Sequence, residues 1–142
     1  MPISAEHAGR TYPPAPAYRV SRAKIAEFAR ALQDDNHAYI SDHPIAPPTF
    51  AAVIAAQAWA AIFGDEELGL ALHRTVHADQ KFDFHRPLRE DDDVVAQLTI
   101  ERVRSRGSLD IVTILVALTV SGEPVCDARS TLMHNREESV DE

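Results

Sequence analysis

The 142-residue sequence contains one cysteine, Cys126, so no disulfide can form within the chain. A lone thiol fits a protein of a reducing compartment. Basic residues are also scarce, because 14 Lys and Arg stand against 22 Asp and Glu and leave a formal net charge of −8. Such a surface repels phosphate backbones, which argues against nucleic acid as a partner.

Long hydrophobic runs are missing as well. The longest, residues 50–63, is shorter than the roughly 20 residues that cross a bilayer. Residues 1–17 lack the apolar core of a signal peptide. We therefore expect a soluble cytoplasmic protein with no membrane partner.

Motifs for cofactors and metals are absent from the sequence. Neither G-x-x-x-x-G-K-[ST] nor G-x-G-x-x-G occurs, so no nucleotide cofactor is predicted. His73 and His77 are four residues apart, but His77 falls in a strand pattern and the two share no helix face. No cysteine accompanies them, and no metal site is predicted.

The length and the 45% hydrophobic content predict one globular domain over residues 1–142. Residues 1–17 are rich in proline and are expected to form an extended lead-in. Residues 135–142 are charged and are expected to form a flexible acidic tail.

Two helices are predicted. The first begins after Ser21, a good N-cap, carries an apolar face, and ends near residues 35–36. The second spans residues 49–64, where Thr49 can cap it and Gly64 can end it. This second helix is apolar on nearly every side, so other elements must cover it completely.

Strands dominate the remainder. A short strand is predicted at residues 17–21, and from Thr75 onward the hydrophobic period is two. In the first of these later strands, Val76, Ala78, Phe82 and Phe84 are predicted to face the core. The later strands are predicted at residues 75–84, 94–103, 109–120 and 125–134. We predict an α+β fold in which one antiparallel sheet wraps around a central helix.

This order of elements resembles the hot-dog fold. Residues 81–92 are similar to the start of the main hairpin of MaoC-like hydratases and dehydratases. Residues 19–40, 46–54 and 78–88 resemble the chain-binding subunit of a heterodimeric (3R)-hydroxyacyl-acyl-carrier-protein dehydratase and the FAS1-like dehydratase domain. The resemblance implies a dimer with a second hot-dog chain, whose sheets join edge to edge. It also implies an acyl thioester of coenzyme A or acyl carrier protein as the substrate, bound at the dimer interface.

Active members of this family carry the signature G-D-x-N-P-[IL]-H after the first helix. In this sequence Asp34 and Asn36 are retained, whereas Tyr39 replaces the His that acts as base. The other three positions also differ, being occupied by Gln33, His37 and Ala38. A tyrosine titrates near pH 10 and a histidine near 6.5, so Tyr39 is a poor base at neutral pH. Because losing a general base typically costs about 10²–10⁴-fold in rate, we expect little dehydratase activity from this chain alone.

A displaced catalytic pair is the alternative. His37 lies two residues before the family position and His43 four after it, so either could approach Asp34. The other interpretation is that the Asp34 carboxylate only caps a turn and that His37 is solvated.

Further candidates for substrate contact are Tyr39, Thr49, Phe50 and Gln80. Each has a structural alternative: Thr49 as an N-cap, Phe50 as core and Gln80 as a side chain bonded to backbone. Pro47 and Pro48 remove two backbone donors where active relatives bind the thioester carbonyl, which weakens that role here.

The sequence thus predicts a subunit that binds the acyl chain beside a catalytic hot-dog partner. The alternatives are a homodimeric (R)-specific enoyl hydratase or dehydratase, a thioesterase, and a non-catalytic binding module. Four arginines are candidates for contact with a carrier protein's acidic helix or a coenzyme A phosphate, although exposed basic residues usually do neither: Arg22, Arg102, Arg104 and Arg106.

Overall fold

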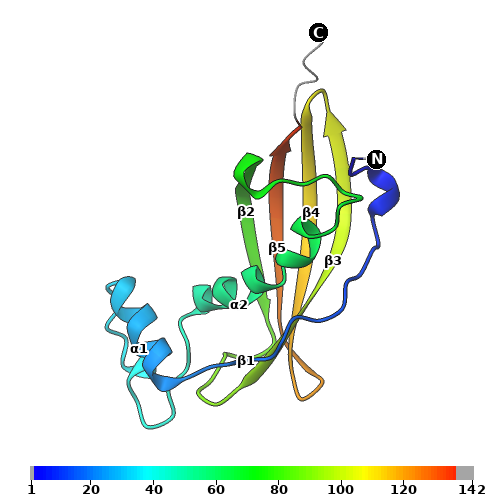
Figure 1. The fold of residues 1–142 in the computed structure, drawn as a ribbon. Coiled ribbons are helices and arrows are strands. Elements are labelled where there is room, and N and C mark those ends of the chain that lie inside the picture. Colours follow the sequence, from blue (N-terminus) through cyan, green and yellow to red (C-terminus); the bar gives the residue numbers. More distant parts are fainter. Residues whose placement is uncertain (1, 137–142) are drawn as a thin grey trace.

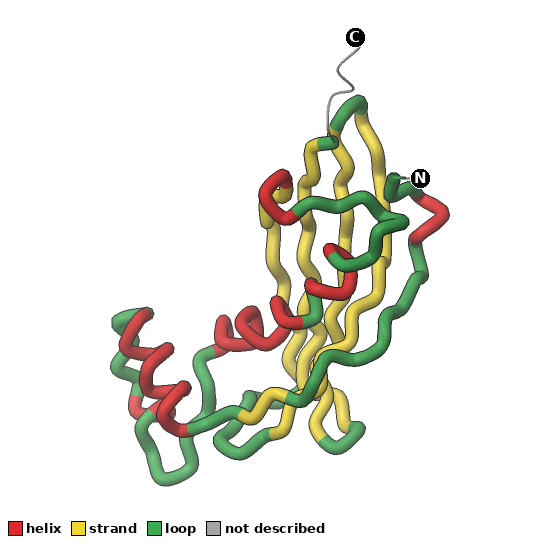
Figure 2. Tube along the Cα trace, in the orientation of Figure 1, coloured by secondary structure: helices red, strands yellow, loops and turns green. Residues whose placement is uncertain are grey.

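The computed structural model describes residues 2–136, and these form one curled antiparallel sheet with its helices on one face (Figures 1 and 2). The strand order is β1-β3-β4-β5-β2. The strands are β1 (Tyr18–Arg19), β2 (Thr75–Phe84), β3 (Asp93–Arg106), β4 (Leu109–Val120) and β5 (Glu123–Asn135). The predicted α+β architecture, an antiparallel sheet around a central helix, is confirmed. Among these residues, none of the helices is both long and apolar enough to cross a bilayer.

Strand β4 occupies the middle of the sheet, as its β-branched sequence predicts. Val112, Ile114 and Val116 are buried against the helices, and the residues between them are half-buried on the outer face. The sheet therefore has a closely packed concave face and an outer face on which apolar side chains are partly exposed to water.

Helix α1 (Arg22–Ala31) begins where it was predicted, because the Ser21 side chain accepts a hydrogen bond from the Lys24 N–H at 3.1 Å. The helix ends earlier than predicted, at Ala31. A 3₁₀ turn, His37–Tyr39, follows it and fixes the segment that carries the family signature.

The central helix is interrupted. A 3₁₀ turn, Pro48–Phe50, leads into α2 (Ala51–Gln57), and after two residues α3 (Ala60–Phe63) continues the path onto the sheet. The prediction that Thr49 caps this helix is wrong, because Thr49 lies inside the 3₁₀ turn and no side chain caps either segment. Gly64 ends α3, as predicted.

The prediction that β2 is half-buried, with its apolar set facing the core, is wrong for most of its length. Strand β2 is an edge strand with β5 as its one neighbour, and Val76 is 60% exposed. A register shift between His77 and Asp79 also moves the first residues of the strand onto the other face. Of the predicted set, Phe82 is the residue that packs against the core.

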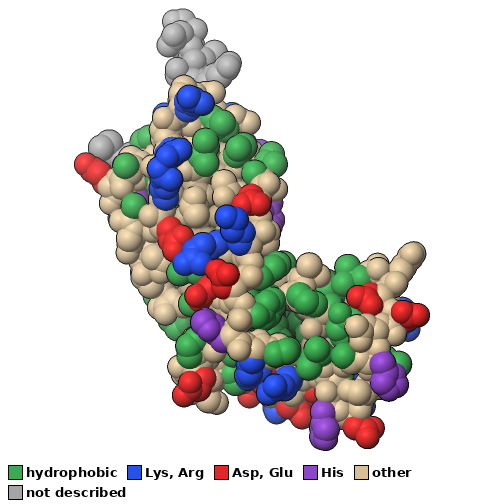
Figure 3. All heavy atoms as spheres, turned by 180° about the vertical axis from the view of Figure 1, so that it is seen from behind, with side chains coloured by type: hydrophobic (Ala, Val, Ile, Leu, Met, Phe, Trp, Pro, Cys, Tyr) green, Lys and Arg blue, Asp and Glu red, His purple; other side chains and the backbone are tan. Residues whose placement is uncertain are grey.

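Beyond this edge, α1 and the start of α2 project away from the sheet (Figures 1 and 2). Seen from behind, hydrophobic side chains line the hollow between this projection and the body of the sheet (Figure 3). The chain thus presents an open strand edge and an apolar hollow next to each other.

The N-terminal segment contains a 3₁₀ turn, Ala5–His7, and then follows β3. Its N–H groups at Gly9, Tyr12 and Ala15 donate to carbonyl groups of β3. Burial and a hydrogen bond to Asp65 raise the pKa of Tyr12 to about 12. Of the predicted tail, Asn135 belongs to β5, and residues 137–142 lie outside the described residues.

A buried polar cluster lies at the end of the sheet remote from α1. Asp110 is fully buried and accepts hydrogen bonds from Ser105 Oγ at 2.7 Å and Arg136 Nε at 3.2 Å. His134 Nδ1 lies 3.5 Å from the same carboxylate, and its Nε2 accepts the Ala71 N–H at 3.1 Å. A buried carboxylate requires such partners, so this cluster joins β3, β4 and β5 to the loop before β2.

Replacing Asp110 tests this role. Asp110→Ala leaves Arg136 and His134 without their shared acceptor, and we expect a loss of about 3–5 kcal/mol in unfolding free energy, measured by urea denaturation. The control is Glu101→Ala, which removes an exposed partner of Arg129 and should cost less than about 1 kcal/mol. Equal effects of the two substitutions would show that Asp110 is no structural centre.

Candidate functional site

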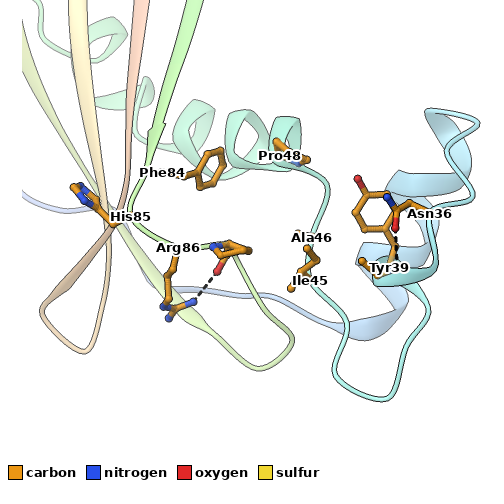
Figure 4. A pocket seen from close by; sticks show the side chains of 10 residues that line it. Asn36, Tyr39, Ile45, Ala46, Pro48, Phe84, His85 and Arg86 are labelled. Carbon is orange, nitrogen blue, oxygen red and sulfur yellow. Dashed lines mark hydrogen bonds between the residues drawn. The ribbon is translucent and has the colours of Figure 1, made fainter.

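A pocket of about 450 Å³ lies between the loop after α1, the approach to α2 and the end of β2 (Figure 4). Its lining is mainly apolar, with one amide, one phenol, one imidazole and one guanidinium. The lining residues are Asn36, Ala38, Tyr39, Ile45, Ala46, Pro48, Phe84, His85, Arg86 and Pro87.

The end of α1 determines how the signature segment enters this pocket. Gln33 has a φ of 55°, and its N–H donates to Arg30 O at 3.0 Å. The Asp34 N–H donates to Ala29 O, also at 3.0 Å, which completes a Schellman motif. Gln33 stands at the family's glycine position, and the left-handed conformation explains why glycine is preferred there.

Two short side-chain bonds then order the next turn. The Asn36 N–H donates to Asp34 Oδ1 at 3.1 Å, and the Ala38 N–H donates to Asn36 Oδ1 at 2.9 Å. These are the local bonds that Asp and Asn make at turns and helix starts. As a result, the Tyr39 side chain turns inward and is only 7% exposed.

Tyr39 stands where the signature of active relatives predicts the catalytic histidine. Burial raises the pKa of Tyr39, and the charge of Asp34 and a hydrogen bond to it raise that pKa further. Its hydroxyl is therefore protonated at neutral pH and can donate a hydrogen bond. It cannot accept a proton from carbon, because it already carries its own.

Neither predicted alternative base lines the pocket. His37 is exposed on the 3₁₀ turn. His43 is also exposed, and it lies near enough to Glu90 to contribute to the lowered pKa of that carboxyl, which is mainly caused by Arg22. Asp34 is exposed beside Tyr39 and is likewise outside the lining.

The remaining predicted contacts lie elsewhere. Thr49 is exposed, and Phe50 is fully buried with its ring against those of Tyr18 and Phe28. Phe50 also borders a smaller hollow of about 200 Å³ between α1 and α2. The Gln80 side chain is bonded to Ser130 and lies near His77 Nε2 at 3.0 Å. The structure brings Asn36 and Tyr39 together, but not Thr49, Phe50 or Gln80 with them.

The residues at the end of β2 were not predicted as site residues. The signal available for them was the aromatic, Arg and Pro pattern of residues 81–92. Arg86 donates two hydrogen bonds to Asp92, at 2.8 and 3.1 Å, so its guanidinium is held by the protein itself. The His85 ring points away from the other lining residues (Figure 4), and its Nε2 lies 3.9 Å from Asp127 Oδ2.

No metal centre is found in the described part of the chain. Among residues 2–136, His, Cys, Asp and Glu form no group of three or more that could hold an ion. The pocket lining itself offers hydrogen-bonding groups and apolar surface for binding.

The family is decided by sequence comparison. The sequence model of the FAS1-like dehydratase domain region matches residues 6–128. This chain belongs to that family. A UPF0336 protein of Cutibacterium acnes, PPA1896, is 52% identical over 139 residues, covering 97% of this chain and 98% of the relative. A UPF0336 protein of Saccharopolyspora erythraea is 41% identical over 143 residues, covering 94% and 92%.

Solved structures show the same fold. One chain of the C-terminally truncated HadBC (3R-hydroxyacyl-ACP dehydratase) complex of Mycobacterium tuberculosis is 32% identical, with a TM-score of 0.78 over 89% of this chain and 96% of that chain. A MaoC-like dehydratase, 22% identical, has a TM-score of 0.78 over 92% of this chain and 42% of its own. This chain therefore has a hot-dog fold, as its sequence predicts.

The protonation of Tyr39 is directly measurable. In the difference between wild type and Tyr39→Phe, tyrosinate absorbance should appear only above about pH 10. Because the folded pKa exceeds the unfolded one, the associated stability is complete below about pH 10 and is lost as pH rises through the folded pKa. Asp34→Asn should lower that pKa without removing the effect of burial. Titration of Tyr39 near neutral pH would contradict the role of hydrogen-bond donor.

Proposed function

We propose that this chain is the acyl-binding subunit of a (3R)-hydroxyacyl-thioester dehydratase, and that a second hot-dog chain supplies the catalytic Asp–His pair. The observation that supports this most directly is Tyr39, a buried and protonated phenol at the position of the base. The substrate would be an acyl thioester of coenzyme A or acyl carrier protein.

The chemistry of the reaction separates binding from proton transfer. Dehydration requires a base for the α-proton and an acid for the departing hydroxyl. The apolar walls formed by Ile45, Ala46 and Phe84 suit an acyl chain. The Tyr39 hydroxyl, which is hydrogen-bonded to Asp34, can donate its one proton to a substrate when it exchanges that partner. The pocket therefore serves chain binding and orientation better than it serves the chemical step.

The need for a partner is supported by the shape of the chain. The β2 edge has unpaired backbone groups on its outer side, and Val76 and Phe84 remain exposed there. The hollow beside the edge is lined by hydrophobic side chains (Figure 3). A second hot-dog chain pairing with β2 would cover both, and the similar M. tuberculosis protein is a HadBC complex.

A homodimeric hydratase that uses Asp34 with His37 or His43 is the second candidate function. It requires one of two exposed imidazoles to enter the pocket, which the bonds of Asp34 and Asn36 around the 3₁₀ turn oppose.

A cytoplasmic location stays a prediction from the sequence.

Hydration of crotonyl-coenzyme A, followed by loss of enoyl absorbance, separates the two functions. We expect no turnover above background from the purified chain, and no difference between wild type and Asp34→Asn. Activity should appear when a hot-dog chain with an intact Asp–His pair is co-purified with it. Turnover by the chain alone that disappears in Asp34→Asn would overturn the subunit assignment.

Binding can be tested without turnover. A long-chain acyl-coenzyme A should raise the melting temperature of the wild type, and Ala38→Trp should abolish that rise by filling the pocket. Ala23→Trp, on the exposed side of α1, is the matched control and should keep the rise. If both variants bind as the wild type does, the acyl chain does not occupy this pocket.

A further inference from the structure

The outer face of the sheet carries a row of apolar side chains, two exposed and one half-buried, at the end remote from the pocket. Ile111 on β4 lies opposite Met133 on β5, and Met133 lies opposite Val76 on β2. Val76 is 60% exposed and Met133 36%. Neighbouring strands are about 4.8 Å apart, so these three side chains form a continuous strip across the sheet.

The same row ends at a basic stripe on β3. Arg104 lies opposite Ile111, and Arg102 and Arg106 stand two residues before and after it. All three arginines are exposed, and within residues 2–136 none of them forms an ion pair. Figure 3, which views the sheet from the side opposite the helices, shows basic side chains in a column beside hydrophobic ones near the top.

A shallow hollow joins the two features. It measures about 380 Å³ and is lined by Arg104, Ser105, Arg106 and Ile111. Three arginines that form no ion pair with other residues of 2–136, next to a half-buried Ile111 and an exposed Met133, are unusual in a chain with a net charge of −8. The arrangement combines a charged border, an apolar strip and a recess, which are the parts of a protein–protein contact.

We propose that this outer-face patch, formed by Arg102, Arg104, Arg106, Ile111 and Met133, binds an acidic amphipathic helix of a protein partner. Alternate residues on a strand are about 6.8 Å apart, and residues i and i+4 of a helix are about 6 Å apart. A helix lying along β3 can therefore place an acidic side chain near each arginine in turn. Its apolar side then rests on Ile111 and Met133, one and two strands away.

Other occupants fit less well. A phosphate backbone would gain from the arginines but not from the apolar strip, and it would be repelled by the acidic remainder of the surface. A second copy of the chain would bring another acidic surface, but it would also bring its own arginine stripe. The patch lies at the opposite end of the sheet from the acyl pocket, so this proposal does not depend on the proposed function.

The probe is a synthetic helical peptide with Glu at i, i+4 and i+8 and Leu along the adjacent side, followed by fluorescence anisotropy at low salt. Arg104→Glu/Arg106→Glu should weaken its binding by about tenfold, because two attractions become repulsions. Arg30→Glu/Arg89→Glu changes the net charge equally at exposed arginines elsewhere and should leave binding unchanged. Met133→Ser should weaken binding about equally at low and high salt.

Several results would overturn the proposal. Equal weakening by the two charge-reversed pairs would show attraction to overall charge and not to the patch. Absence of peptide binding, with binding of a DNA duplex or of anionic vesicles, would assign the arginines to phosphate. Concentration-dependent self-association that is lost in Arg104→Glu/Arg106→Glu would identify a second copy as the occupant.

Discussion

Burial of the central helical segment is the constraint on which the rest of this structure depends. Residues 50–63 are apolar over most of their length, and the concave face of the sheet covers the part that lies on it. The prediction that other elements cover this segment completely is wrong, because Ala56, Gln57 and Ala60 are exposed. Phe50, Ile54 and Ile62 are fully buried, yet Val53 near the start of α2 is still 37% exposed. The long strands β3, β4 and β5 curl around this segment, which reaches the concave face from the side of the β2 edge (Figure 1).

The turn after α1 keeps its local order although a tyrosine stands where the family signature has its histidine. Asp34 and Asn36 still organise the turn after α1 through bonds to backbone N–H groups, so their carboxylate and amide retain a structural use. The ring at position 39 still points inward, but burial and the neighbouring carboxylate keep its proton in place. A nearby negative charge raises the pKa of either side chain. It would make a histidine a stronger base, whereas it holds a tyrosine in its protonated form.

Features with a local cause were predictable from the sequence. The Ser21 cap and the antiparallel strands depend on neighbouring residues, and the weakness of Tyr39 as a base depends on its own chemistry. The early end of α1 was not predictable, because Gln33 adopts a left-handed conformation with a φ of 55°. In a sequence, that conformation is expected at glycine or asparagine and not at glutamine. The exposure of β2 was missed because alternation does not reveal whether a strand has neighbours on both sides. Phe84 joins the pocket through contacts with residues nearly 50 positions away in the chain, which no periodicity reports.

The reactivity of the single thiol, Cys126, can report whether the sheet is intact. It is fully buried in β5, which lies between its paired strands β2 and β4 in the sheet. Burial, together with the charges of Asp127 and Asp83, raises its pKa to about 12, so almost no thiolate exists in the folded state. An alkylating reagent can reach it only when β5 separates from its neighbours. Chemical labelling of this one atom therefore counts opening events of the sheet, without any added probe and without interference from a second cysteine.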